Sequence, residues 1–533
     1  MAQQQLWNDD ILREIFSHLG PTTFPSSKAD RPCLAALSCC ARTGKVLYDP
    51  AIDMLWREID SLAILLSVLS PPLVKTENKH QRSFVLAGEI SATDYARFQF
   101  YARRVRKLVH RAERDRIHPT VVAALHGHSD GQPLLPSLRA LFWCQRTPPD
   151  VLEILPLVSP FLKELCIAEI GVQGSLLPPS GVQSSNGFAF GRFIHALSIA
   201  APRLETLTLS GNIHSSSILC VSELKQLKAL SIINFAQHGF GAGYLPVLRS
   251  CAALSHLREF GINLSADGAL SPLSLNADAT EADFDRDFDG FHSLRSLRVH
   301  GSLSLVSRFL SHVSSAELAS FGVFVPRPDR WEDYRGCLDT LCTRFASSLR
   351  AVRFSGSWTG NLASLVRPMD VLAPLLRLPQ LEEVCIISGT AVALSLTTED
   401  ALTLAKAWPK LKEFKLLYQP VPAALPIDAL GAFATHCPQL ETLWLASVDL
   451  RGVGLRDLEA SPASDHGLTN IWLAGDVAAA DAALAARFID KIFPRVDPRP
   501  VELPWHPGQN AEKWEALLVC LREVKAARLG RTL

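Results

Sequence analysis

Apolar residues recur along most of the chain in one short phrase, Leu-x-x-Leu-x-Leu, in which other apolar residues replace some of the leucines. Successive copies lie mostly 23 to 32 residues apart. A fixed period of this size is typical of a solenoid, whose stacked repeats bury one continuous core. Nine clear copies begin at Leu204, Leu227, Leu257, Leu294, Leu349, Leu381, Leu411, Leu440 and Leu468, and three weaker ones at Leu138, Leu162 and Leu318.

Each repeat is expected to hold one strand and one helix. The second half of every phrase alternates apolar and other residues, which predicts a short strand. Helical stretches lie between the phrases at 191–201, 334–348, 401–408 and 428–437, and proline directly follows three of these four. We therefore predict an α/β solenoid, with a parallel sheet on the concave inside of a curved body and helices outside.

The pattern divides the chain into four parts. Residues 6–60 are expected to form a small three-helix domain, and 134–475 the repeat array. Residues 61–133 are interpreted as a helical connector, and 476–533 as a C-terminal helical cap or tail. The connector carries a basic stretch, which we interpret as the solvated face of a helix, because 53 basic residues in the chain are balanced by 53 acidic ones. This stretch comprises Arg103, Arg104, Arg106, Lys107 and Arg111.

The array resembles the leucine-rich-repeat family. The fullest match runs from Leu204 through Leu207 and Leu209 to Asn212, and it includes the asparagine that bonds the turn backbone in that family. Other copies have Ser302, Gly389, Gln419 or Val448 in that place, so the repeats are degenerate.

The N-terminal segment opens with an amphipathic helical pattern. Asn8 is a suitable N-cap, and an apolar stripe at helical spacing follows from Ile11 to Leu19. The run from Leu6 to Phe16 resembles the F-box, a three-helix module, and is similar to F-box proteins of mushroom-forming fungi. It departs from the F-box pattern in having Trp7 where proline is usual, and in a long loop at 20–32.

The F-box resemblance implies a partner and a role. An F-box docks on the Skp-type adaptor of a cullin-RING ubiquitin ligase, so the chain is expected to be a substrate-recruiting subunit whose array binds a target protein. The alternative is a ligase-independent scaffold or inhibitor whose N-terminal helices only cap the solenoid. A cap would turn its apolar stripe toward the array. The resemblance assigns adaptor binding to Leu6, Trp7, Ile11, Leu12, Ile15, Phe16, Leu34, Leu37 and Trp56.

One column of residues is expected to carry target binding. The fifth residue of each phrase lies between two inward ones and should point out of the sheet. Its C-terminal half holds three cations, Arg298, Arg353 and Lys415, which suit a phosphorylated target, and two tryptophans, Trp444 and Trp472, which suit an apolar contact. Whether these indoles form an open platform or are covered by the tail after residue 500 stays open. The whole column reads Phe142, Cys166, Thr208, Ser231, Gly261, Arg298, Gly322, Arg353, Cys385, Lys415, Trp444 and Trp472.

Composition and motifs argue against several other functions. The formal net charge is zero, without the basic excess of a nucleic-acid binder, and no apolar run is long enough to cross a membrane. The twelve cysteines have no repeated spacing, so we expect free thiols in a reducing compartment, the cytoplasm or the nucleus. No arrangement typical of a catalytic, cofactor or metal site occurs, and we expect no enzymatic activity.

Overall fold

The computed structural model describes most of the chain in two compact units, one up to Leu257 and one from Arg258 onward. The described residues are 9–20, 31–69, 73–78, 81–111, 115–145, 151–169, 187–213, 215–235, 245–264, 288–359, 368–388, 396–418, 424–446, 448–450, 464–473, 479–499, 511–528 and 530.

The first unit begins with a module of three helices, α2 (Asp9–Ser17), α3 (Arg31–Thr43) and α4 (Lys45–Leu55). Phe16, Leu37 and Ala51 form its buried centre, one from each helix. Around this centre pack the partly buried side chains of Leu19, Leu34, Cys40, Ala41, Leu47, Met54 and Leu55. The predicted adaptor residues Leu6 and Trp7 lie outside the described residues.

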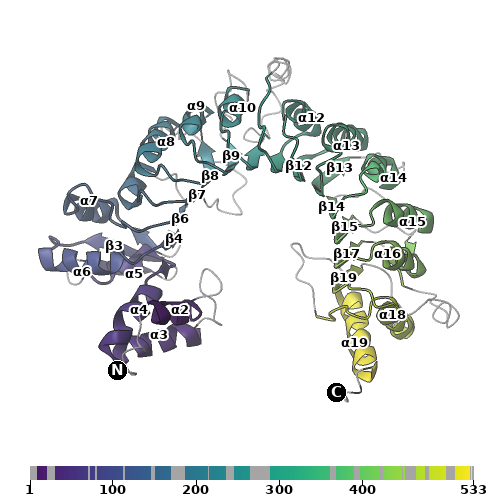
Figure 1. The fold of residues 1–533 in the computed structure, drawn as a ribbon, viewed down its shortest axis with the longest axis horizontal. Coiled ribbons are helices and arrows are strands. Elements are labelled where there is room, and N and C mark those ends of the chain that lie inside the picture. The colour runs from purple at the N-terminus through teal and green to yellow at the C-terminus, as the bar shows by residue number, and fades with distance from the viewer. Residues whose placement is uncertain are drawn as a thin grey trace. The chain divides into compact units, whose positions relative to one another are not determined.

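A parallel sheet follows the module within the same unit (Figure 1). Leu108, Leu141, Leu165, Leu207 and Leu230 occupy one register row and are buried, as the alternation in the phrases predicts. The strands, in their order in the sheet, are β1 (Glu58–Ile59), β4 (Lys107–Arg111), β6 (Ala140–Gln145), β7 (Glu164–Glu169), β8 (Thr206–Ile213) and β9 (Ala229–Phe235). The helical segments between and after them are α5 (Leu62–Leu66), α6 (Ala92–Ala102), α7 (Pro119–Gly127), η2 (Val151–Leu157), α8 (Gly187–Ala200), α9 (Ser215–Ile218), η3 (Leu219–Glu223) and α10 (Leu245–Ala252).

The connector differs from the all-helical segment expected over 61–133. Beside α5, α6 and α7 it holds a small sheet of β2 (Leu73–Asn78), β3 (Gln81–Leu86) and β5 (Asp115–Ile117), and its strand β4 belongs to the main sheet. Val105, Leu108 and Val109 are spaced as on one helix face, which is why the basic stretch reads as helical. In the structure Leu108 and Val109 instead belong to strand β4, in which Leu108, Val109 and His110 are all buried.

The second unit repeats the same construction with larger core side chains. Phe260, Phe321 and Phe414 belong to its buried register row, and removing such side chains from water contributes about 2–3 kcal/mol each. Its strands are β10 (Glu259–Asn263), β11 (Ser296–His300), β12 (Ser320–Arg330), β13 (Ala351–Thr359), β14 (Glu383–Ser388), β15 (Glu413–Leu417), β17 (Thr442–Leu445) and β19 (Asn470–Leu473), with β16 (Leu425–Pro426) and β18 (Val448–Asp449) in a separate pair.

Helices cover one face of the sheet in this unit (Figure 1). We call the opposite face the second face.

The helix α15 starts at a reciprocal cap, in which Thr397 accepts a hydrogen bond from the backbone of Asp400 while the Asp400 carboxylate accepts one from the backbone of Thr397. The helical segments are α12 (Leu303–Ser311), α13 (Trp331–Phe345), α14 (Pro368–Leu372), η5 (Ala373–Arg377), α15 (Thr398–Ala407), η6 (Ile427–Ala429), α16 (Leu430–His436), α18 (Ala479–Ile492) and α19 (Ala511–Arg528).

These elements confirm the predicted fold class, an α/β leucine-rich-repeat solenoid. Within each unit, the described strands of the main sheet follow the order of the chain, as stacked strand–helix repeats require. At the C-terminal end, α19 packs on α18, and Lys525 lies 3.2 Å from the buried Asp490 carboxylate. None of the described helices has both the length and the apolar character needed to cross a membrane.

A buried histidine in the first repeats predicts a pH-dependent stability. His110 is 1% exposed and stacks on Trp143 with ring centroids 4.2 Å apart. Burial lowers the pKa of His110 to about 4, and the nearby charge of Asp115 opposes this only in part. Above its unfolded pKa of about 6.5 the histidine is neutral in both states, and below that value only the unfolded chain gains the proton.

We therefore expect the free energy of unfolding to fall by about 2 kcal/mol between pH 7.5 and pH 5 because of this one group. Urea titrations across this range would measure it, with His110→Phe removing most of the decrease. The exposed His126→Gln serves as the control and should retain the full decrease. An identical pH dependence in wild type and His110→Phe would contradict the assignment.

Candidate functional site

The first helix of the N-terminal module is apolar on two sides. Leu12 and Phe16 are each 5% exposed and point into the module, whereas Ile11 and Ile15 are 49% and 51% exposed. In a helix with 3.6 residues per turn, residues four apart lie on one stripe. Leu12 and Phe16 therefore form a packed stripe, and Ile11 and Ile15 form a solvated stripe beside it. An isoleucine pair half-exposed on one helix is a surface suited to a partner.

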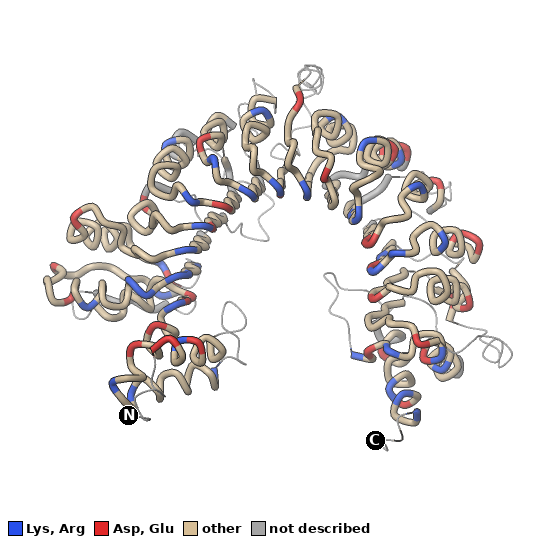
Figure 2. The backbone as a smooth tube through the Cα atoms, in the orientation of Figure 1, with Lys and Arg blue, Asp and Glu red and all other residues tan. Residues whose placement is uncertain are grey.

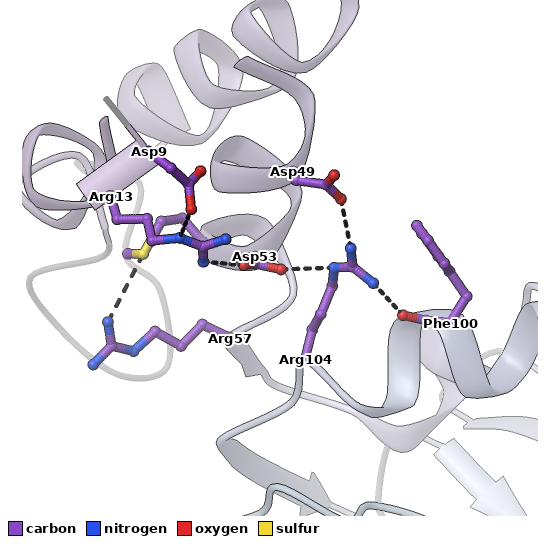
Figure 3. Close-up of polar contacts among 8 residues, drawn as sticks. Asp9, Arg13, Asp49, Asp53, Arg57, Phe100 and Arg104 are labelled. Atoms are coloured by element: carbon purple, nitrogen blue, oxygen red, sulfur yellow. Dashed lines mark hydrogen bonds and ion pairs between the residues drawn. The ribbon is translucent and has the colours of Figure 1, made fainter. Parts of the chain in front are cut away.

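The module is attached to the rest of its unit through α4, whereas those isoleucines belong to α2. Arg104, which follows α6, is nearly buried and donates a hydrogen bond to Asp49 at 2.8 Å, while its Nε lies 2.7 Å from Asp53 (Figure 3). Its third contact, 2.5 Å to the carbonyl of Phe100, anchors the guanidinium to α6. Arg13 of α2 also pairs with Asp53, so one carboxylate joins two helices of the module to the connector.

Trp56 takes part in this attachment. Its ring lies against Tyr101 of α6, with centroids 4.4 Å apart. Among the predicted adaptor residues, therefore, Ile11 and Ile15 lie at the surface and Leu12, Phe16 and Leu37 in the module core. Leu34 is half-buried at its edge, and Trp56 faces the connector.

The predicted target-binding column exists in each unit as a row of register partners on neighbouring strands. In the second unit, Cα register partners run from Gly261 through Arg298, Gly322, Arg353, Cys385, Lys415 and Trp444 to Trp472. In the first unit they run from Phe142 through Cys166 and Thr208 to Ser231. The phrase spacing thus placed these side chains one strand apart, about 4.8 Å from each other.

The three cations of the column differ in their surroundings. Arg353 pairs with Glu383, and Lys415 lies 3.1 Å from Glu413 and 4.2 Å from the ring centre of Trp444. Arg298 is exposed, and the described part of the chain offers it no carboxylate. Of the three cations predicted for the column, two are therefore paired with carboxylates, and Arg298 has no ion pair among the described residues.

The two tryptophans are buried, each with 7% of its surface exposed. They lie on neighbouring strands, as predicted, and the indole nitrogen of Trp444 donates a 3.3 Å hydrogen bond to the side-chain oxygen of Asn470. The cation–π contact with Lys415 covers one face of Trp444. The sequence left open whether the two indoles form an open platform or are covered. Their burial agrees with the second alternative.

A depression between two arginines was not apparent from the sequence. A side chain at Gly322 would meet Arg298 at 3.6 Å and Arg353 at 4.0 Å, so the glycine leaves a gap between them. Phe324, two residues on along the same strand, is 43% exposed. The sequence does place this glycine and phenylalanine at outward positions of the Leu318 phrase, but that phrase is one of the three weaker copies.

Other chemistry on the second face is limited. Burial raises the pKa of the Cys385 thiol, and of the Cys166 thiol, to about 11, so both are neutral near pH 7. Within the described ranges, no group of three or more His, Cys, Asp or Glu side chains is placed to hold a metal ion. The arrangement offers hydrogen bonds, charge and apolar contact, which are means of binding.

No protein-family model and no curated protein sequence matches this chain. Among solved structures, the chain is similar to an internalin from Listeria monocytogenes, at 12% identity, covering 84% of this chain and 89% of that one with a TM-score of 0.31. It is also similar to a chain in the complex of Rad7 and Elc1 from yeast, at 13% identity, covering 88% and 94% with a TM-score of 0.37. Likeness at this level carries no information about partners.

The Arg104 contacts predict a specific effect on the module. Arg104→Ala removes the donor shared by Asp49 and Asp53, and we expect it to destabilise the module by about 1–3 kcal/mol. Hydrogen exchange of the α4 amides would report this as lost protection. The neighbouring Arg103→Ala is the matched control, because Arg103 is exposed, lies over the ring of Phe100 and forms no ion pair among the described residues. Equal protection in the two variants would refute the role of Arg104.

The column predicts a contrast between a buried and an exposed member. Trp444→Ala removes a buried indole and should lower the free energy of unfolding by about 3–5 kcal/mol. Arg298→Ala should change it by less than about 0.5 kcal/mol, as for most exposed positions. Urea unfolding of the full chain would measure both. A Trp444→Ala variant as stable as wild type would mean that the indole is not a structural element.

Proposed function

We propose that the chain is a substrate-recruiting F-box subunit of a cullin-RING ubiquitin ligase. The observation that carries the proposal is the half-exposed pair Ile11 and Ile15 on a module attached through a different helix. A module that only capped the solenoid would turn its apolar stripe toward the repeats. Here α4 makes the attachment, and α2 keeps an apolar stripe available for a Skp-type adaptor.

The small core of the module supports the same proposal. Only Leu12, Phe16, Leu37, Pro50 and Ala51 are buried among its described residues between 9 and 55. A domain that buries so little gains stability from any partner that covers its apolar surface. An adaptor seated on α2 would supply this burial, and the module would then present the whole chain to the ligase.

The repeat array would hold the target protein on its second face. Exposed arginine and phenylalanine side chains, represented by Arg298 and Phe324, are the kinds of residue found at protein interfaces. In this role the chain catalyses no reaction. It raises the local concentration of a target lysine near the ubiquitin-conjugating enzyme, which is an effect of proximity.

The test is co-purification with the host's Skp-type adaptor. Ile11→Asp combined with Ile15→Asp should weaken adaptor capture by about 2 kcal/mol or more, the size of an interface hot spot, and leave the melting temperature of the array unchanged. Changing Phe16 instead would unfold the module, since Phe16 is part of its core. Deleting the whole segment 6–60 is a poorer test, because it would also remove β1 from the sheet.

Ile199→Asp is the matched control, because Ile199 is 72% exposed on α8 in the same unit. It should leave capture intact. If wild type fails to capture the adaptor, or if both variants capture it equally, the F-box proposal is rejected and a ligase-independent scaffold becomes the better explanation.

A further inference from the structure

In the first unit, each strand of the main sheet is directly preceded by a charged residue. We call these six residues the leading row. Backbone hydrogen bonds join its successive members: Arg106 donates to Arg57 at 2.8 Å, and Arg139 to Arg106 at 2.7 Å. The row comprises Arg57, Arg106, Arg139, Lys163, Glu205 and Lys228.

In the second half of the row, positive and negative side chains pair with each other. The Glu205 carboxylate lies 3.1 Å from Lys163 and 2.7 Å from Lys228, one member on either side. These hydrogen bonds lower the pKa of Glu205, with Lys228 making the larger contribution. Opposite charges on neighbouring strands are the ordinary arrangement in a sheet.

The first half contains three arginines in succession. Arg57 and Arg139 are exposed and Arg106 is half-buried, and no carboxylate among the described residues pairs with any of them. Arg57 contacts the sulfur of Met54, and Arg106 donates a long 3.4 Å hydrogen bond to the carbonyl of Ser137. Figure 2 shows basic residues at the start of neighbouring strands in this unit.

The carboxylate whose charge acts on Arg106 is already engaged. Asp53 lies close enough to influence Arg106, but it pairs with Arg13 and Arg104, and Arg57 extends away from it (Figure 3). Burial lowers the pKa of Arg106, and the charges of Arg139 and Arg57 lower it further. The three arginines thus repel one another in the free chain. The other three members of the row, Lys163, Glu205 and Lys228, attract one another instead.

We propose that Arg57, Arg106 and Arg139 form a binding site for an acidic segment of a partner protein. Guanidinium groups bind carboxylates through two parallel hydrogen bonds, so each arginine can take one acidic side chain. The site stands on the first unit alone. It is separate from the isoleucine stripe of α2 and from the second-face column, and it does not depend on the proposed ligase role.

The dimensions favour a short extended peptide. From Arg57 to Arg139 the row spans two strand spacings, roughly 10 Å, which an extended chain covers in about three to four residues. Alternate side chains of such a chain lie about 6.6 Å apart on one side, so two or three acidic residues can reach the three arginines. The basic run ends at Glu205, and the chain as a whole is neutral, which does not suit the long basic track of a nucleic-acid site.

The experiment uses the full chain and a fluorescent peptide of alternating glutamate and glycine, with a glutamine–glycine peptide as the uncharged reference. Wild type should bind the acidic peptide at low ionic strength and lose affinity as salt is added. Arg57→Gln combined with Arg139→Gln should weaken binding by about tenfold or more, since each change removes a charge-assisted contact. Arg192→Gln with Lys225→Gln is the control, because it removes two exposed cations outside the row and should change binding by less than about twofold.

Melting temperature gives a second readout. Neutralising Arg57 and Arg139 should leave it unchanged or raise it at low salt, because repulsion is relieved and no ion pair is lost. A clear fall would mean that these arginines hold the structure together and would overturn the proposal. So would equal weakening by the two double variants, absence of binding by wild type, or binding of oligothymidylate in place of the acidic peptide.

Discussion

The structure depends on apolar side chains that meet across neighbouring strands. A single strand–helix repeat exposes both sides of its apolar layer, and this layer is covered only when neighbouring repeats pack against it. In the second unit the row from Phe260 to Ile471 is continuous, so each side chain packs between those of the strands before and after it. Loss of one member leaves a cavity shared by two repeats, since close-packed cores relax only partly.

The same register that aligns the core also aligns the opposite face. Because side chains alternate along a strand, fixing Leu297 and Phe321 inward fixes Arg298 and Gly322 outward as neighbours. The surface rows are thus a by-product of core packing, and their chemistry can vary without cost to the fold. The leading row lies before the strands and is aligned by the same register: Lys163 and Glu205 form an ordinary ion pair there, whereas Arg57, Arg106 and Arg139 have no carboxylate partner among the described residues.

In the N-terminal module, α4 makes the attachment to the rest of the unit, and α2 keeps apolar side chains exposed. Arg104 is buried where it meets Asp49 and Asp53, and removing a partner from such a site leaves a charge without compensation. This connection uses α4 and leaves the outer side of α2 uncommitted. A binding helix held by its neighbour can present its apolar residues without unfolding when the partner is absent.

The sequence is enough to predict the period, the α/β solenoid and the membership of the second-face column, because apolar alternation in each phrase dictates which side chains point inward. The folded structure was needed to show that Trp444 and Trp472 are buried, that Lys415 is neutralised by Glu413, and that the basic stretch includes strand β4. Burial and ion pairing depend on neighbours one repeat away or more. The spacing of Val105, Leu108 and Val109 is helical, so the pattern predicted a helix where pairing with neighbouring strands forms β4.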